Sequence, residues 1–137
     1  MSDMIGDVLA YLGLAALIGG MLFFGAIVAP LVFTKLPPET AGAFIRTMFP
    51  RYYGYMIVTS LIAAGGFWLR GGMISAVLLV LLALLTCWLM FYLIPHLNML
   101  RDSGQTASFN RGHTLSVWLN GVELLTALGV LVRLALG

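Results

Sequence analysis

The chain has 137 residues, of which 61% are hydrophobic and only 9% are charged, with a formal net charge of +2. Soluble globular domains contain about 25% charged residues, so the composition excludes a soluble fold and predicts an integral membrane protein. The small net charge and the scattered arginines exclude a nucleic-acid-binding surface. The sequence also lacks the glycine-rich, GxSxG and HExxH motifs of nucleotide-binding proteins, hydrolases and zinc peptidases. We therefore predict no catalytic residue and expect no enzyme of these classes.

Four long apolar segments account for almost the whole chain, and they cover about residues 8–34, 53–69, 72–98 and 114–136. Each is close to the ~20 residues that an α-helix needs to cross the hydrocarbon core of a bilayer. The sequence therefore predicts one all-α transmembrane domain over residues 1–137, folded as a four-helix bundle with antiparallel up-down topology. The lipid bilayer is its first expected partner.

Small residues occupy one face of the first span, where Gly13, Ala16 and Gly20 recur at spacings of three and four residues. Such a face lets another helix approach closely, and we expect it to form a helix contact, including a contact between subunits of a homo-oligomer. The N-terminal flank carries Asp3 and Asp7 rather than the basic residues of a secretion signal. We therefore expect the first span to stay in the mature protein.

Prolines divide the region between the first two spans. Pro37 and Pro38 are expected to end the first span, and residues 39–49 have the apolar spacing of a short amphipathic helix lying at the membrane interface. Pro50 then precedes the second span. The short turn at residues 70–72 predicts that the second and third spans are antiparallel neighbours.

Basic residues are distributed unequally between the two ends of the predicted bundle. Two lie on the side of the termini, Arg70 and Arg133, and five lie in or beside the other two loops: Lys35, Arg46, Arg51, Arg101 and Arg111. By the positive-inside rule, these two loops are cytoplasmic and both termini lie outside the cytoplasm. We expect a location in a bacterial inner membrane.

A polar stripe runs along one face of the fourth span and consists of His113, Ser116, Asn120 and Glu123. Glu123 lies about 15 Å deeper along the helix than His113, close to the middle of the bilayer. A charged side chain at that depth costs at least a few kcal/mol. We therefore predict that the stripe faces the interior of the bundle.

Polar residues on other spans can join this stripe in a funnel open to the cytoplasm. The second span offers Arg51, Tyr55 and Thr59 at i, i+4 and i+8, and the third offers His96 and Tyr92 one turn apart. From the cytoplasmic surface inward, the predicted layers are Arg51, His96 and His113; then Tyr55, Tyr92 and Ser116; then Thr59 and Asn120; and finally Glu123. Interhelical hydrogen bonding alone is the alternative interpretation of the stripe.

Three stretches carry a resemblance to known membrane proteins. They are GGMLFFGAIVAPLVF at residues 19–33, the Pro95-His96 pair, and the pattern F-N-R-x-H-x-x-S-x-x-x-N formed by Phe109, Asn110, Arg111, His113, Ser116 and Asn120. The chain resembles the transmembrane protein 205-like family, whose function is unassigned. More loosely, it is similar to the four-helix copper-resistance-D and protoporphyrinogen-oxidase membrane proteins.

The resemblance implies four membrane helices and, through the eukaryotic members of the family, a link to platinum-drug resistance by export. The oxidases would imply haem and a histidine in the first span, but this span contains no histidine. That difference counts against an oxidase.

Three functions remain open at this point. The first is transport or resistance, in which Glu123 exchanges a proton or cation and His96 and His113 serve as metal ligands at the entrance, in a homo-oligomer. The second is a haem- or tetrapyrrole-binding protein for electron transfer or oxidation, with haem b on His96 or His113. The third is a non-catalytic scaffold that docks partners through residues 39–49.

Overall fold

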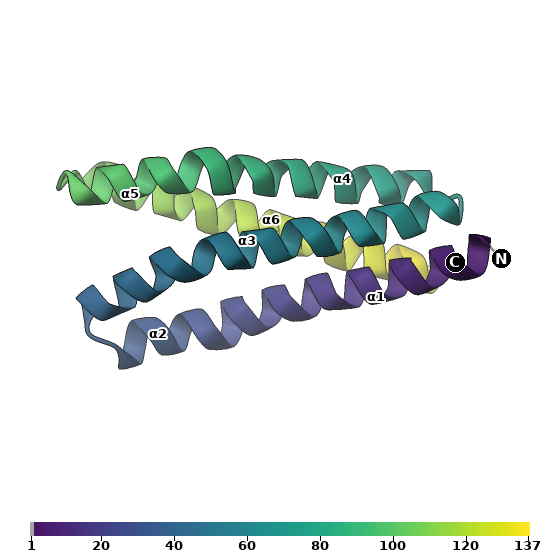
Figure 1. The fold of residues 1–137 in the computed structure, drawn as a ribbon, viewed down its shortest axis with the longest axis horizontal. Coiled ribbons are helices and arrows are strands. Elements are labelled where there is room, and N and C mark those ends of the chain that lie inside the picture. The colour runs from purple at the N-terminus through teal and green to yellow at the C-terminus, as the bar shows by residue number, and fades with distance from the viewer. Residues whose placement is uncertain (1) are drawn as a thin grey trace.

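The computed structural model describes residues 2–137 of the chain, and all secondary structure in this part is helical (Figure 1). The elements in chain order are α1 (Ser2–Phe23), η1 (Phe24–Val28), α2 (Ala29–Lys35), α3 (Pro38–Leu69), α4 (Met73–Trp88), η2 (Leu89–Leu93), α5 (Ile94–Asp102) and α6 (Thr106–Leu136). The two η elements are single π-helical turns that join their neighbours without a break.

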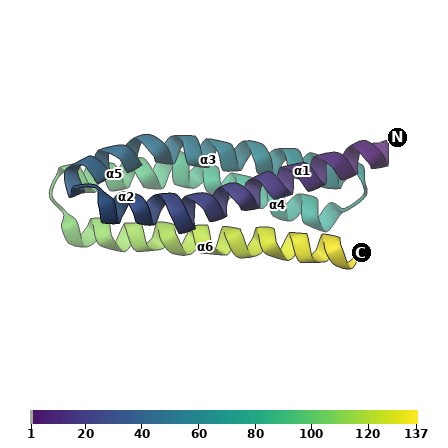
Figure 2. The same cartoon turned by 90° about the horizontal axis from the view of Figure 1, so that it is seen from below.

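The eight elements form four rods, which run up and down the molecule with both termini at the same end (Figures 1 and 2). Each rod is long and apolar enough to cross a membrane, and the rods contain 30 to 33 residues. At ~1.5 Å per residue they are about 45–50 Å long, which exceeds the ~30 Å hydrocarbon core of a bilayer. The predicted four-helix membrane bundle is confirmed, and its rods extend beyond the hydrocarbon.

Each π turn comes shortly before a proline. The Ala29 N–H bonds to the Phe24 carbonyl just before Pro30, and the Ile94 N–H bonds to the Leu89 carbonyl just before Pro95. Proline lacks an N–H, and its ring collides with the carbonyl four residues earlier in a regular α-helix. The wider π turn relieves this conflict, so the first and third rods pass their prolines without ending.

Residues 39–49 do not form the separate interfacial helix that the sequence predicted. They are helical, but α3 continues from Pro38 through Pro50 to Leu69. Pro50 is exposed on this helix. The apolar side chains of Ala41 and Ile45 are buried inside the bundle, so these two residues are not available on a free surface.

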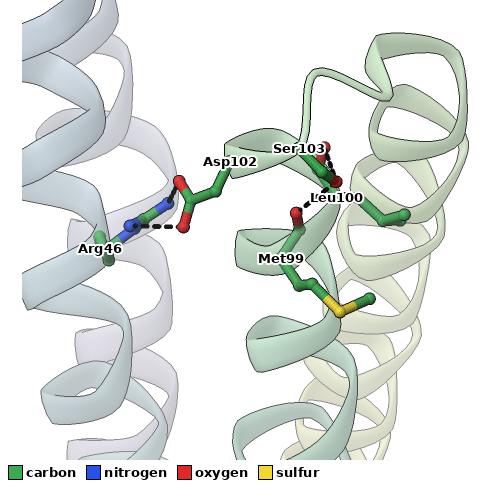
Figure 3. A network of polar contacts seen from close by, with 5 residues as sticks. All are labelled: Arg46, Met99, Leu100, Asp102 and Ser103. Atoms are coloured by element: carbon green, nitrogen blue, oxygen red, sulfur yellow. Dashed lines mark hydrogen bonds and ion pairs between the residues drawn. The ribbon is translucent and has the colours of Figure 1, made fainter.

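The fourth rod also begins earlier than predicted. Helix α6 starts at Thr106, and only residues 103–105 separate it from α5. At this end of the bundle, Nη2 and Nη1 of Arg46 on α3 donate to the Asp102 carboxylate at the end of α5, at 2.9 and 3.4 Å respectively (Figure 3). At the opposite end, Arg70 forms an ion pair with Asp7 at 2.8 Å. The two ion pairs therefore connect neighbouring rods at both ends of the bundle.

Candidate functional site

A buried carboxyl group lies at the centre of the fourth rod. Glu123 of α6 has only 1% of its surface exposed. Along the helix axis it is about 18 Å from Arg111 and about 15 Å from Arg133, at ~1.5 Å per residue. The two arginines are the basic residues that flank this span. This position corresponds to the middle of the membrane.

Thr86 of α4 is the hydrogen-bonding partner of this carboxyl group. Its hydroxyl, which is fully buried, contacts Glu123 Oε2 and also lies 2.8 Å from the Leu82 carbonyl in its own helix. Glu123 Oε1 is buried and has no hydrogen-bonding partner among the described residues 2–137. The carboxyl group is therefore satisfied on one oxygen only.

The number of protons in the Thr86–Glu123 contact indicates which protonation state of Glu123 the contact favours. The Thr86 hydroxyl has a single proton, and two acceptor oxygens lie within its reach. Both contacts are full hydrogen bonds only when Glu123 is protonated and donates to Thr86 while Thr86 donates to Leu82. The geometry thus accommodates a neutral carboxylic acid better than a carboxylate.

Asn120 continues the polar face one turn from Glu123, toward the loop end of the bundle. Its Oδ1 accepts a hydrogen bond from the Tyr52 hydroxyl at 3.2 Å, and its Nδ2 lies 3.8 Å from the Met56 sulfur. The Tyr52 ring is stacked on Phe24, with ring centroids 4.2 Å apart. We refer to Tyr52, Thr86, Asn120 and Glu123 as the midspan cluster.

A cavity of about 480 Å³ lies at the end of the bundle away from the termini, between α2, α3, α5 and α6. Aromatic and aliphatic side chains form most of its wall. Its polar lining residues are Asn98, Arg101, Thr106, Asn110 and His113. His113 is the first residue of the α6 stripe, so the cavity lies at the loop-end start of the same helix face that carries Glu123.

The structure brings the predicted α6 stripe together along the inner side of one helix. His113 is half-buried in the cavity wall, Ser116 and Glu123 are buried, and Asn120 lies between them at intermediate exposure. The Ser116 hydroxyl donates to the His113 carbonyl at 2.7 Å, within its own helix. The stripe therefore leads from the cavity to the middle of the membrane.

The predicted companions on the third rod are placed elsewhere. Tyr92 is 62% exposed, and His96 is exposed beside it, with the two rings stacked at 6.3 Å. Tyr92 lies within the π turn η2, which changes the rotation per residue relative to a regular α-helix. Their assignment to the funnel is wrong, because both side chains lie on the outside of the bundle.

The predicted companions on α3 also lie mainly outside the funnel. Arg51 is exposed and donates to the Thr47 carbonyl at 3.0 Å, while the exposed Tyr55 donates to the Ala16 carbonyl at 2.6 Å. Thr59 is buried, but its hydroxyl donates to the Tyr55 carbonyl at 2.8 Å in its own helix. The funnel layers that contained Arg51 and Tyr55 are therefore wrong.

Two members of the midspan cluster were not predicted. Tyr52 follows Arg51 directly, and one residue turns a helix face by about 100°, so the sequence placed the wrong neighbour toward Asn120. Thr86 is a polar residue in the middle of the apolar run LLALLTCWLM at residues 81–90. Its depth matches that of Glu123, and this signal could have identified it.

The two histidines do not share a site. His113 lines the cavity, whereas His96 is exposed and does not belong to the cavity wall. Within residues 2–137, no three His, Cys, Asp or Glu side chains gather where a metal ion could bind. The expectation that His96 and His113 together hold a metal ion at the entrance of the funnel is therefore wrong.

The small-residue face of α1 packs against α3 of the same chain. A Cβ atom on Gly13 would lie 2.6 Å from the Ala63 backbone nitrogen, and one on Gly20 would collide with the Tyr55 ring. The Ala16 carbonyl accepts the Tyr55 hydrogen bond. Because α3 covers this face, it is not free to form the predicted contact with a second subunit.

The four apolar rods define a small polytopic membrane protein. Residues 12–106 match the family described as a domain of unknown function, DUF4149, and the chain belongs to this family. No curated protein and no solved structure matches the chain. The matched residues begin within the first rod, include the second and third rods and end before the stretch at 109–120, so the resemblance to the transmembrane protein 205-like family stays a prediction.

Proposed function

We propose that this protein exchanges a cation, in the simplest case a proton, between the middle of the bilayer and one membrane surface, with Glu123 as the exchanging carboxyl group. The observation that carries the proposal is the buried Glu123 Oε1 that has no hydrogen-bonding partner among residues 2–137. An ionisable residue inside a membrane is costly and is retained mainly for function.

A purely structural role accounts for less of this geometry. Joining α4 to α6 through Thr86 needs one hydrogen-bonding oxygen, which a hydroxyl side chain on α6 could also supply without a second polar atom. A carboxyl group adds a second oxygen whose burial without a partner costs about 1–3 kcal/mol. Proton or cation exchange gives that second oxygen a use.

The surroundings of Glu123 support access from one side only. Toward the loop end, the α6 face continues through Asn120 and Ser116 to His113 and the cavity. Toward the termini, the buried α6 side chains are apolar, namely Ala127, Val130 and Leu134. The charge distribution supports assigning the loop end to the cytoplasm, so we propose that exchange occurs with the cytoplasmic side.

The other two functions have weaker support. A haem protein would have to use His113 alone, because His96 is exposed on the outer surface. A scaffold that docks through residues 39–49 would have to do so without Ala41 and Ile45, because both are buried inside the bundle. Neither function makes use of a buried, half-satisfied Glu123.

Proton uptake by the protein in proteoliposomes, followed with a pH-sensitive dye, tests the proposal. After a small acid step near neutral pH, the wild-type protein should take up protons that Glu123→Gln does not, because the proposed exchange is with one membrane surface. Glu39→Gln, which removes an exposed carboxyl group near the loop, is the matched control and should retain the wild-type uptake. Unchanged uptake in Glu123→Gln would refute the proposal.

Infrared spectroscopy provides a second readout, which detects the proton on the carboxyl group directly. A protonated carboxyl group in an apolar site gives a C=O stretching band that Glu123→Gln should remove and that should respond to the bath pH in the wild type. A band that is absent from the wild-type protein at every pH would contradict the neutral acid that the Thr86 contact favours.

A further inference from the structure

The cavity at the loop end has the size and lining of a binding site for an amphiphilic molecule. Its volume of about 480 Å³ falls within the ~300–1,000 Å³ of typical small-molecule sites. Phe49, Ile94 and Leu97 belong to its apolar wall, and Asn98 and Arg101 lie near the end of α5. One part of a ligand would thus meet hydrocarbon side chains, and another part would meet polar groups.

The polar groups of this cavity favour an anion. Among the described residues 2–137, Arg101 is the one permanently charged residue that lines the cavity, and no Asp or Glu lines it. Asn98, Asn110, Thr106 and His113 add hydrogen-bond donors. A guanidinium group with neighbouring donors is well suited to carboxylate or phosphate oxygens.

Arg101 is free to bind a ligand because the carboxylate next to it in the sequence already has a different partner. The adjacent Asp102 is held by two nitrogens of Arg46 (Figure 3). Within residues 2–137, Arg101 itself makes no ion pair and no side-chain hydrogen bond. The nearest carboxylate in the sequence is therefore engaged elsewhere, and the guanidinium keeps its charge for a partner outside the chain.

Gly42 fixes the place of this guanidinium group. A Cβ atom at residue 42 would collide with Arg101 Nη2 and would lie 2.6 Å from both Cζ and Nη1. The guanidinium group therefore occupies space on α3 that any other residue would fill. Gly42 and Arg101 together hold a positive charge at the cavity wall, at the same end of the bundle as the Arg46–Asp102 ion pair.

We propose that this cavity binds an acidic phospholipid from the surrounding bilayer, with its phosphate at Arg101 and an acyl chain along the wall formed by Phe49, Ile94 and Leu97. The rods extend beyond the hydrocarbon core, so the Arg101 end of the cavity lies at the level of lipid head groups. A phospholipid at this level would meet the charge with its phosphate and the apolar wall with its chain. This inference goes beyond the proposed function and does not require Glu123.

Native mass spectrometry of the protein released from nanodiscs tests the inference. The nanodiscs contain phosphatidylcholine with a minor fraction of phosphatidylglycerol, and the readout is the phosphatidylglycerol retained per chain, followed by titration of the delipidated protein. Arg101→Gln should weaken phosphatidylglycerol binding about 10- to 100-fold, as expected for loss of a hydrogen bond to a charged group. Arg111→Gln removes an exposed arginine of the same membrane face that does not line the cavity, and it should retain wild-type binding.

Gly42→Ala tests whether the position of the Arg101 charge matters for lipid binding, in addition to its presence. The added methyl group displaces the guanidinium group but leaves the net charge unchanged, so we expect phosphatidylglycerol binding to weaken several-fold. Equal effects of Arg101→Gln and Arg111→Gln would overturn the inference, because they would indicate a general surface-charge effect. Wild-type affinity in both Arg101→Gln and Gly42→Ala would overturn it as well.

Two competition experiments identify the class of ligand that the cavity binds. Glycerol 3-phosphate carries the phosphate without acyl chains and should fail to compete, whereas equal competition would overturn the lipid assignment in favour of a soluble phosphate. Phosphatidylcholine, which has no net charge, should compete poorly, and equal retention of both lipids would overturn the role of charge. Glu123→Gln should retain phosphatidylglycerol, so a failure of proton exchange and a failure of lipid binding are distinguishable.

Discussion

The contact between α1 and α3 and the loop-end cavity use glycine for opposite purposes. In the first region, Gly13 lets the backbone of α3 approach so closely that a Cβ atom would lie 2.6 Å from the Ala63 nitrogen. In the second, Gly42 leaves space that the Arg101 guanidinium group occupies. The first glycine joins two backbones, and the second makes room for a charged side chain beside a cavity.

The difference shows where this bundle can tolerate change. At the α1–α3 contact the opposing atoms belong to the backbone of a long helix, which cannot move locally without moving the rod. At the cavity the opposing atoms are the far end of a flexible side chain. We therefore expect the same substitution, glycine to alanine, to have different effects in the two regions.

The largest effect is expected for Gly13→Ala. The new methyl group meets backbone atoms of Ala63, and overpacking of this kind costs about 1–3 kcal/mol, offset in part by the better helix propensity of alanine. The measurement is the free energy of unfolding in mixed micelles, with Gly19→Ala as the control because a Cβ atom there meets nothing within 4 Å. Equal stability of the two variants would show that the α1–α3 contact is looser than the structure indicates.

The next largest effect is expected in the midspan cluster. Thr86→Val removes the partner of Glu123 and should lower the free energy of unfolding by about 1 kcal/mol, within the ~0.6–2 kcal/mol range of interhelical hydrogen bonds in membranes. In a Glu123→Met background, Thr86→Val should have almost no effect. The double-mutant cycle measures this coupling, and a coupling near zero would mean that the two side chains do not interact in the membrane.

A smaller effect is expected for Tyr55→Phe, which removes the hydrogen bond from the Tyr55 hydroxyl to the Ala16 carbonyl. We expect a loss of about 0.6 kcal/mol in the free energy of unfolding. Tyr92→Phe removes a hydroxyl from an exposed tyrosine without a hydrogen bond within residues 2–137 and should leave the stability unchanged. If both substitutions had the same effect, the Tyr55–Ala16 contact would not contribute to joining α1 and α3.

The smallest effect on stability is expected for Gly42→Ala. Its methyl group displaces only the end of Arg101, so the free energy of unfolding should change by no more than about 0.5 kcal/mol. Thermal unfolding of Gly42→Ala and Gly13→Ala in the same detergent makes the comparison between the two regions directly. A large destabilisation by Gly42→Ala would show that the cavity end is as tightly packed as the α1–α3 contact.

Much of the α6 stripe could be predicted because it depends on a single regular helix. The spacing of Ser116, Asn120 and Glu123 places them on one face wherever that helix packs, and the cost of a carboxyl group in the membrane turns this face inward. The companions on other rods could not be predicted in the same way. Their facing depends on the rotation of each rod, and a difference of one residue exchanges Arg51 for Tyr52.

The π turn in the third rod is a second reason why the companions of the α6 stripe could not be predicted. Regular helical spacing joined Tyr92 and His96 to the interior, but η2 interrupts that spacing before Pro95. The proline was visible in the sequence, although the way in which the helix passes it was not. Continuous helices through Pro30, Pro50 and Pro95 show that proline alone did not mark the ends of these rods.

The sequence by itself determined that four apolar helices cross a membrane, because hydrocarbon accepts only a backbone whose hydrogen bonds are satisfied internally. It also determined the depth of Glu123, because helical rise is constant. Only the tertiary structure decided that Thr86 satisfies one oxygen of this carboxyl group and that Gly42 holds Arg101 at a cavity. These contacts depend on the rotation and separation of rods distant in the chain, which side-chain packing sets and periodicity does not encode.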